Sequence, residues 1–247
     1  MLWACILLPQ LAMDGVQRHR ANPGEPLVLL TGSPQRRVLQ AVNPAARALG
    51  LKPGQSLTAA QTLTRGFATA EYDLAAIERW QQFLAAWAYG FSAQVSLHYP
   101  RCLLLEVQSS LGLFGPWPRF EARLRAELSA LAFQHRIAVA PNPAAARVLV
   151  NVGDGLMASD ERMLKQMLDP LPVDRLGLSA TVPMAFNRMG LRQLRQLLAL
   201  PRDSLAKRFP AEVLRHLDTL SGQRPLALDF FVPVDVFDTR IELNFEV

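Results

Sequence analysis

Cysteine is scarce in this chain, and acidic residues are missing from two of its apolar stretches. Cys5 and Cys102 are the only cysteines among 247 residues, which excludes a disulfide framework and gives no metal-ligand spacing. We expect both thiols to be reduced and buried. Residues 1–13 and 79–105 contain no Asp or Glu. Chemistry that needs carboxylates therefore cannot be located in either stretch.

Long hydrophobic runs are also missing. The apolar N-terminus, LWACILLPQLAM, is shorter than the roughly 20 residues that a membrane-spanning helix needs, and it has neither a basic flank nor a small-residue cleavage site. Half of the residues are hydrophobic, which is enough for one large core or a few smaller ones. We therefore expect a soluble, cytoplasmic, multidomain protein that does not contact a membrane.

Positive charge is concentrated in one part of the chain. Residues 162–224 carry 11 Lys and Arg against five Asp and Glu, whereas residues 225–247 carry one against five. A compact basic segment suits nucleic-acid backbones, because each neutralised phosphate releases counterions. A solvent-exposed Arg-rich helical surface without a nucleic-acid partner would give the same pattern.

The first 65 residues predict short strands and helices. ACILLPQL and PLVLLTG are brief apolar runs bounded by turn residues, which is typical of buried strands. The segment after them predicts a helix that starts at Asn43 and Pro44 and stops before Gly50, since Asn caps helices, Pro favours the first turn and Gly follows the last. Ser56 is placed to cap a second helix.

A longer helix and a strand–helix–strand unit follow. EYDLAAIERWQQFLAAWAYGFS has apolar residues at helical spacing, which predicts an amphipathic helix. VSLHYPRCLLLEV is strand-like. Within it RCLLLEV is a predicted strand, HRIAVAP is another, and WPRFEARLRAELSALAF between them is a predicted helix. The long helix would turn the following residues toward the core: Leu74, Ile77, Phe83, Leu84 and Trp87.

Recurring prolines predict a separate domain of short helices from about residue 160. Before it, NPAAARVLVNV repeats the Asn-Pro helix start at Asn142 and Pro143. The last stretch, LALDFFVPVDVFDTRIELNFEV, is rich in strand-forming residues, and the sequence stops within a predicted strand. We therefore expect the chain to be a fragment of a longer protein. The interrupting prolines are Pro170, Pro172, Pro183, Pro201 and Pro210.

This order of elements resembles the Y-family lesion-bypass DNA polymerases. GSPQRRVLQAVNPAARALGLKPGQSL is similar to their fingers, LLLEVQSSLGLFG to a palm strand and its turn, and RIAVAPNPAAARVLV to a strand-to-helix junction. The resemblance implies an α+β fold with a mixed palm sheet, a small fingers insert, an all-helical thumb and the start of a β-rich little finger. The implied ranges are 1–22 and 73–160 for the palm, 23–72 for the fingers, 161–224 for the thumb, and 225–247 for a linker and a truncated little finger.

The resemblance also places the family's metal ligands on residues without carboxylates. Active members hold two divalent cations through carboxylates, and the cations activate the primer hydroxyl and stabilise the leaving pyrophosphate. Aligned on GVQR, the two acidic positions of the first motif fall on Leu8 and Gln10. Aligned on LLLEV, an Asp-Glu pair falls on Arg101 and Cys102. A guanidinium would repel the cations, so we expect no bound metal, no cofactor and no polymerase chemistry.

Neither of the two acids nearest to these positions is expected to replace the missing ligands. Glu106 lies five residues beyond Arg101, roughly 16 Å along an extended strand. Asp14 lies six residues beyond Leu8, in a predicted helix, and one carboxylate there would not organise two metals.

Positions that would contact a nucleotide are only partly kept. By the same resemblance, Arg47 and Arg147 match cations near the triphosphate, although each, taken alone, is more typical of a surface or salt-bridging residue. Pro44 and Pro143 replace an expected Tyr and Lys, and Met13 stands at the aromatic sugar gate. We therefore expect nucleotide binding to be weak or lost.

The segment PVDRLGLSATVPMAFNRMGLRQLRQLLALP resembles a helix-hairpin-helix pair. Such hairpins present backbone N–H groups to DNA phosphate through Gly-apolar-Gly turns. The first turn, at Gly177, has Ser179 in place of its second glycine, and the second keeps Gly190. We expect the fold to be kept and phosphate binding to be reduced. Either DNA or an acidic protein partner would suit a set of exposed cations in this segment. They are Arg188, Arg192, Arg195, Arg202, Lys207, Arg208 and Arg215.

A polymerase-like chain without metal ligands resembles the catalytically inactive family members of the bacterial mutasome. That resemblance implies a non-catalytic adaptor, a pseudoenzyme, in damage-induced mutagenesis. Its implied partners are DNA, a RecA-like companion protein, an error-prone replicative-type polymerase and, through segments beyond Val247, the sliding clamp. Two alternatives stay open: an active lesion-bypass polymerase that uses unrecognised acids, and a stand-alone DNA-binding module.

Overall fold

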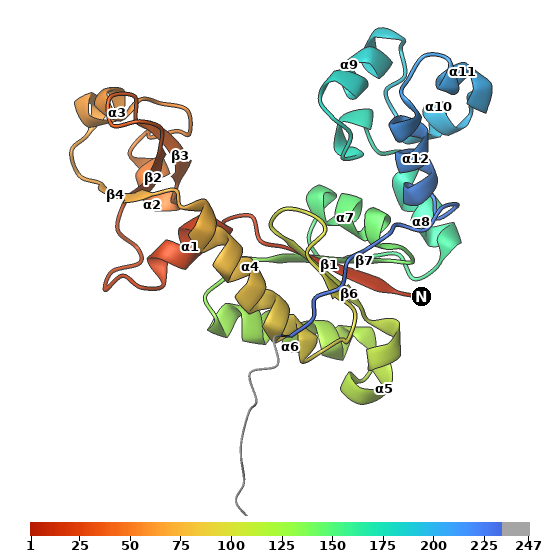
Figure 1. Ribbon diagram of the computed structural model, residues 1–247, viewed down its shortest axis with the longest axis horizontal. Coiled ribbons are helices and arrows are strands. Elements are labelled where there is room, and N and C mark those ends of the chain that lie inside the picture. Colours follow the sequence, from red (N-terminus) through yellow and green to blue (C-terminus); the bar gives the residue numbers. More distant parts are fainter. Residues whose placement is uncertain (234–247) are drawn as a thin grey trace, which may run out of the picture.

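A five-stranded sheet forms the centre of the computed structural model, which describes residues 1–233 (Figure 1). Its strands lie in the order β5-β6-β1-β7-β8. β1 is antiparallel to both of its neighbours, and β8 is parallel to β7. The sheet is therefore mixed, as predicted. The strands are β1 (Trp3–Leu7), β5 (Val95–Ser96), β6 (Cys102–Glu106), β7 (Arg136–Ala140) and β8 (Leu156–Met157).

β1 is buried along its whole length, and its side chains alternate between two cores. Cys5 and Leu7 pack on the face covered by α7 (Pro143–Val152), and this core continues into the C-terminal helices. Ala4 and Ile6 pack on the opposite face, under α4 (Leu74–Tyr89) and α6 (Trp117–Ala130). A strand with both faces covered needs a continuous apolar run, which the N-terminal sequence supplies.

The predicted strand–helix–strand unit is confirmed. β6 and β7 run parallel to each other on either side of β1, and α6 connects them across the second core. The short helices of this region are α1 (Leu11–Gln17), η1 (Gln108–Ser110) and α5 (Leu111–Phe114).

In the central region, the structure differs from the prediction at the segment 95–107 and in the orientation of α4. The strand predicted at RCLLLEV is confirmed as β6, but the wider strand-like segment 95–107 is a hairpin of β5 and β6, with Arg101 in the left-handed region at φ 56°. In α4, Leu74 and Phe83 are 71% and 42% exposed instead of facing the core. The buried side of this helix is formed by Leu84 and two alanines one and four residues later, because the real stripe is rotated from the assumed one.

A second, three-stranded sheet carries the helices α2 (Pro44–Ala48) and α3 (Leu57–Leu63) at the upper left of Figure 1. The helix starts at Asn43 and Ser56 are confirmed, since both side chains accept the capping hydrogen bond. Only one of these strands was predicted, and the first residues assigned to the long helix belong to β4 and the turn after it. The order is β3-β2-β4, for β2 (Leu27–Thr31), β3 (Val38–Val42) and β4 (Ala68–Glu71).

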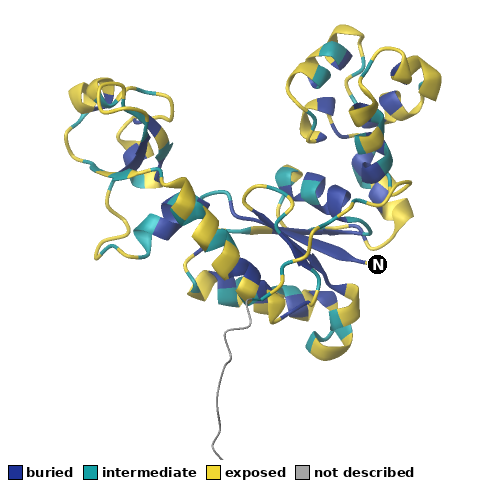
Figure 2. Ribbon diagram, in the orientation of Figure 1, coloured by how far each residue is buried: buried dark blue, intermediate teal, exposed yellow. Residues whose placement is uncertain are grey.

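Short helices pack around the buried Phe186 at the upper right of Figure 1, and Figure 2 shows that their outer surfaces are exposed. Within residues 1–233, no helix combines the length and hydrophobicity that crossing a bilayer requires. The helices, as predicted from residue 160 on, are α8 (Glu161–Leu168), η2 (Val173–Arg175), α9 (Thr181–Arg188), α10 (Leu194–Leu198), α11 (Arg202–Ala206) and α12 (Ala211–Leu220).

After α12, the chain returns to the central sheet without forming a strand before residue 234. The Phe231 N–H donates to the Val95 carbonyl at 2.7 Å, and the ring of Phe230 stacks on Trp3 with a centroid separation of 6.5 Å. The strands expected here are therefore wrong for residues 226–233. The start of the little finger that was predicted beyond them lies outside the described residues.

The side chain of Asn43 connects the start of α2 to β2 through hydrogen bonds. Its buried Oδ1 accepts from the N–H groups of Ala46 and Leu27 at 2.9 and 3.0 Å, and its Nδ2 donates to the Glu25 carbonyl at 2.7 Å. Asn43→Ala should lower the free energy of unfolding by about 2–4 kcal/mol, because buried groups lose their partners. Ser56→Ala, which removes only an exposed cap, should cost about 1 kcal/mol.

Urea unfolding, combined with hydrogen exchange of the Leu27 amide, measures the two effects. Faster exchange at Leu27 is expected only for Asn43→Ala. Equal losses of stability for the two variants would contradict the assigned role of Asn43.

Candidate nucleic-acid interface and predicted metal position

The positions predicted to correspond to metal ligands meet at one end of β1 and β6. Leu7 pairs with Cys102, and the N–H of Leu8 donates to the carbonyl of Arg101 at 2.8 Å. Gln10 follows at the start of α1, where its side chain makes no capping bond. The structure thus brings the four positions Leu8, Gln10, Arg101 and Cys102 together, while their equivalence to the family's ligands stays a prediction.

The side chain of Arg101 is exposed, and a backbone hydrogen bond fixes the turn that carries it. The N–H of Cys102 donates to the Tyr99 carbonyl at 3.2 Å, which closes the turn before β6. The Arg101 side chain donates from Nη1 to the Pro9 carbonyl at 3.3 Å. Within residues 1–233 it forms no ion pair, so its positive charge is not neutralised by a carboxylate.

The two acids nearest in sequence to these positions accept hydrogen bonds from backbone N–H groups. Asp14 Oδ2 accepts from the N–H of Gln134 at 2.8 Å. The two oxygens of Glu106 accept from the N–H groups of Gln108 and Ser109 at 2.9 and 3.2 Å. Both carboxylates are buried. In the described part of the chain, no three His, Cys, Asp or Glu side chains are grouped so that they could hold a metal ion. The residues at this position therefore do not fit the two divalent cations that the fold family implies.

The two cysteines lie beside each other at the same place, which was not predicted. Both are free and buried, as expected, and each thiol affects the pKa of the other. Burial raises the pKa of the Cys5 thiol, with the Cys102 thiol acting in the same direction. The pKa of the Cys102 thiol is lowered by its hydrogen bond with Cys5 and by the nearby charges of Arg147 and Arg101, although burial opposes this.

The predicted nucleotide-binding remnants are not gathered into one site. Arg147 lies on α7, with its guanidinium 5.6 Å from the ring centroid of Tyr99, next to the cysteines. Arg47 is exposed on α2 of the other sheet. Met13 is buried against Leu27 and Leu29 instead of lining an open surface.

Both predicted hairpin glycines adopt a conformation that favours glycine. Gly177 and Gly190 have φ of 78° and 77°. Five of the predicted cations are exposed and form no ion pair within the described residues: Arg188, Arg192, Arg195, Lys207 and Arg208.

Two of the predicted cations are partly neutralised. Arg202 pairs with Asp218, and Arg215 approaches Glu212 at 3.8 Å.

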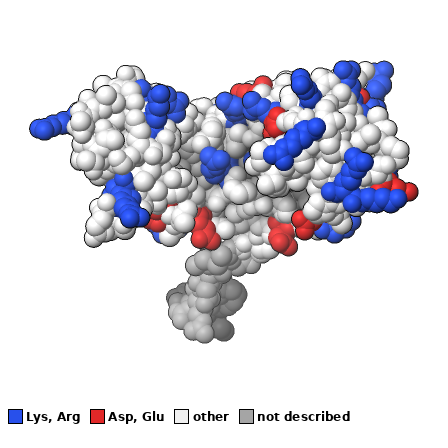
Figure 3. Space-filling model, turned by 90° about the horizontal axis from the view of Figure 1, so that it is seen from above, with Lys and Arg blue, Asp and Glu red and all other residues white. Residues whose placement is uncertain are grey.

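Figure 3 shows Lys and Arg on both sides of the hollow between the two outer parts of the molecule.

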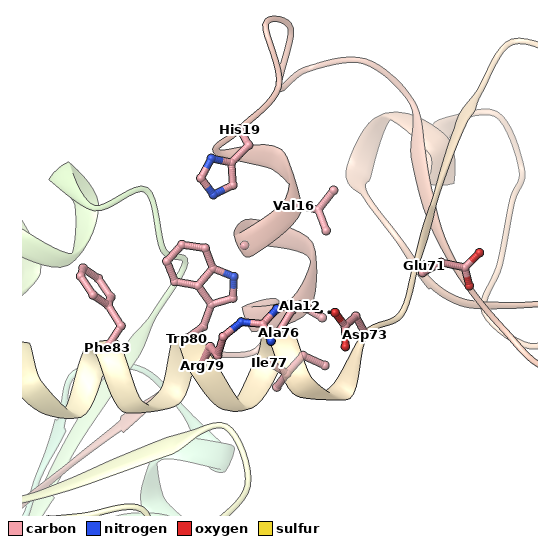
Figure 4. A pocket seen from close by; sticks show the side chains of 11 residues that line it. Ala12, Val16, His19, Glu71, Asp73, Ala76, Ile77, Arg79, Trp80 and Phe83 are labelled. Atoms are coloured by element: carbon pink, nitrogen blue, oxygen red, sulfur yellow. Dashed lines mark ion pairs between the residues drawn. The ribbon is translucent and has the colours of Figure 1, made fainter.

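A pocket of about 610 Å³ lies elsewhere, between α1 and α4 (Figure 4). Trp80 and Phe83 of α4 line it, and Gly15 allows α1 to approach, since a Cβ there would lie 2.4 Å from Trp80 Nε1. Arg18 stacks over Trp80, 4.7 Å from the ring centroid. No residue predicted to contact metal, nucleotide or DNA lines this pocket.

Comparison with solved structures identifies the fold. The chain is similar to the insertion ternary complex of Dbh DNA polymerase, with a TM-score of 0.76, 18% identity, and coverage of 93% of this chain and 70% of that one. It is also similar to DinB from Sulfolobus solfataricus, with a TM-score of 0.72, 17% identity, and coverage of 93% and 70%. The chain therefore has the fold of a Y-family DNA polymerase, as predicted.

Sequence comparison gives the family. The chain belongs to the impB/mucB/samB family, whose model matches residues 16–151. It is 30% identical over 193 residues to the proteins called Protein ImuB in two strains of Caulobacter vibrioides, NA1000 / CB15N and ATCC 19089 / CIP 103742 / CB 15. The match covers 78% of this chain and 42% of the length of these curated relatives.

Asp14 makes stability depend on pH. Burial raises the pKa of its carboxyl to about 6, and the N–H of Gln134 only partly offsets this. The folded protein therefore holds a proton that the unfolded chain releases above about pH 4, so stability falls as the pH rises from about 4 to 6. Asp14→Asn should raise the free energy of unfolding at pH 8 by about 1 kcal/mol, allowing for solvent screening.

Urea unfolding at pH 4 and pH 8 checks this prediction. The gain from Asp14→Asn should disappear at pH 4, where the wild-type carboxyl is largely protonated. As the matched control, Asp203→Asn changes an exposed acid that forms no ion pair within residues 1–233, and it should produce no such pH-dependent difference. A destabilisation by Asp14→Asn that is equal at both pH values would contradict the buried-charge explanation.

Proposed function

We propose that this chain is the polymerase-like part of a non-catalytic adaptor in DNA damage tolerance and induced mutagenesis. One observation carries the proposal: Leu8, Arg101 and Cys102 occupy the strand ends where the resemblance expects metal-binding carboxylates. Membership of the impB/mucB/samB family and likeness to Protein ImuB support a role in DNA damage tolerance.

Electrostatics argues against polymerase chemistry at this place. Two divalent cations need several anionic oxygens within coordination distance. Asp14 and Glu106 cannot be recruited without breaking the bonds that their carboxylates make to backbone N–H groups. Arg101 adds a positive charge that would repel the cations.

We propose that the remaining parts of the body dock on DNA through the thumb, residues 161–224. Exposed cations and hairpin glycines support weak phosphate contacts to primer-template or single-stranded DNA. The palm would comprise residues 1–22 and 73–160, and the fingers 23–72. Acting in the cytoplasm, the full protein would recruit a RecA-like protein of the ImuA type, an error-prone replicative-type polymerase and, through segments beyond Val247, the sliding clamp.

Primer extension tests this function. The protein should not extend a primer with magnesium or manganese, yet it should bind primer-template DNA with an affinity that falls as salt rises. Extension that scales with protein and is abolished by a chelator would support the active-polymerase alternative. Full DNA affinity, with no partner recovered when the RecA-like protein, the polymerase and the clamp are supplied, would favour the stand-alone DNA-binding module.

A triple variant measures how much the thumb contributes to DNA binding. It combines Arg188→Gln, Arg192→Gln and Arg195→Gln. If all three contact phosphate, the slope of log affinity against log salt should decrease by about 2–3. Arg119→Gln on α6 is the matched control, because it also removes an exposed cation. The same slope for the triple variant and the wild type would exclude these arginines from the interface.

Restoring the ligands provides a separate prediction. The combined change Leu8→Asp, Arg101→Asp and Cys102→Glu should not restore full polymerisation, because Pro44, Pro143 and Met13 also depart from the family pattern. Thermal unfolding must first show that the variant is folded, since Leu8 and Cys102 are buried. Robust magnesium-dependent extension by this variant would show that those other departures matter little.

A further inference from the structure

Two adjoining hollows form a groove among the C-terminal helices α8, α10, α11 and α12 (Figure 1). Their volumes are about 440 and 240 Å³. They meet at Leu198, Leu217, Ser221 and Gln223, and we call them together the leucine groove. The lining comes from these four helices and the residues next to them, and not from α9 or the two hairpin glycines. The leucine groove is therefore a different surface from the predicted hairpin contacts to phosphate.

Leucine side chains form the floor of this groove, and one of them is open to solvent. On α10, Leu194 and Leu197 are buried, whereas Leu198 is 44% exposed and lines both hollows. The N–H of Arg195 donates to the Asp169 carbonyl at 3.0 Å, which ties the end of α8 to α10 and fixes the shape of the groove. A partner that covers Leu198 would remove apolar surface from water without having to order the groove first.

The rim of the leucine groove is acidic, although the helices around it are mostly basic. Residues 162–224 carry 11 Lys and Arg against five Asp and Glu. The lining of the groove reverses this balance, with Glu161, Asp169 and Asp218 against Lys165 and Arg202. These acids would repel the phosphates of a nucleic acid. The groove therefore suits a protein partner with basic residues.

Asp169 has a carboxylate oxygen without a partner. It directly follows the last residue of α8, where the negative end of the helix dipole disfavours a carboxylate. Its Oδ2 accepts from the Lys165 ammonium, whereas Oδ1 is buried and accepts no hydrogen bond within the described part of the chain. An ammonium or guanidinium group from a partner would supply the missing donor.

We propose that the leucine groove binds an amphipathic helix of a partner protein, with apolar side chains in the two hollows and a Lys or Arg beside Asp169. An added strand would need an open sheet edge, and a polyproline segment would need an aromatic groove, whereas helices lined by leucine form these walls. On a helix, residues three or four positions apart lie on one face, so two apolar anchors and a basic neighbour can reach the groove together.

This binding surface goes beyond the proposed function, which assigns no surface to a protein partner. It also does not depend on that function, because binding of a helical peptide requires neither DNA nor the absence of polymerase chemistry. Primer extension and the salt dependence of DNA binding test the adaptor proposal separately, so the two can fail independently.

Selection from a phage-displayed library of random peptides of about 15 residues, roughly four helical turns, tests the proposal. The peptides that bind the full chain should share apolar residues at helical spacing and at least one Lys or Arg. Calorimetric titration with a synthetic peptide of that consensus then compares variants. Leu198→Glu should weaken binding at least about tenfold, because it places a charge between the two hollows. Asp169→Asn should weaken binding and reduce its salt dependence, because it removes one charge pair.

Each variant has a matched control elsewhere in the chain. Leu113→Glu changes a leucine of α5 that is 81% exposed, and Asp203→Asn changes an exposed acid that lines neither hollow. Both controls should bind the peptide like the wild type. Leu198 is already partly exposed and Asn is close to Asp in size, so both test variants should fold, which circular dichroism verifies.

Three results would overturn the proposal. The first is a selection that yields no peptide, or peptides without helical spacing or without a basic residue. The second is equal affinity of the wild type and Leu198→Glu for the consensus peptide. The third is displacement of this peptide by single-stranded DNA, which would assign the groove to nucleic acid instead of a protein.

Discussion

The pairing of β1 with both β6 and β7 holds the two cores of the central region together. This strand contributes apolar side chains to both cores of the central region, and its ladder places Leu7 beside Cys102. Without it, α7 on one face and α4 and α6 on the other would have no common surface to cover. The same pairing also fixes the positions of Leu8 and Arg101 through a backbone hydrogen bond.

Because backbone bonds define this place, its side chains can change while the fold remains. A cluster of carboxylates carries like-charge repulsion when no metal is bound, so it reduces the stability of the empty protein. Leu8 is instead fully buried in the second core, where it contributes apolar contacts. Apolar and cationic side chains at these strand ends are thus compatible with a stable body of this fold.

Local signals in the sequence predicted local structure well. The helix starts at Asn43, Ser56 and Asn142 follow from side chains that cap their own helix, so no distant information was needed. The strand β4 was missed because its pairing with β2 is parallel and distant in sequence. The orientation of α4 was wrong because Trp80, Phe83 and Leu84 make it hydrophobic on several sides, and only packing decides which side is buried.

At the candidate site, too, the sequence predicted the positions of the residues but not the contacts of their side chains. Its four positions were located by resemblance and are indeed adjacent in space, yet the hairpin turn at Arg101 lacks the glycine that usually signals a left-handed residue. The contact between Cys5 and Cys102 and the unpartnered donors of Arg147 arise from tertiary packing across β1, β6 and α7. No local pattern in the sequence encodes them.

Manganese binding, followed by electron paramagnetic resonance, distinguishes an empty metal position from an occupied one without requiring DNA or activity. The wild-type protein should have no high-affinity manganese site, since Leu8, Arg101 and Cys102 offer no carboxylate. A stoichiometric, micromolar site that is lost when Asp14 or Glu106 is replaced by its amide would contradict this expectation. That result would mean that these acids leave their backbone partners and rebuild a metal centre.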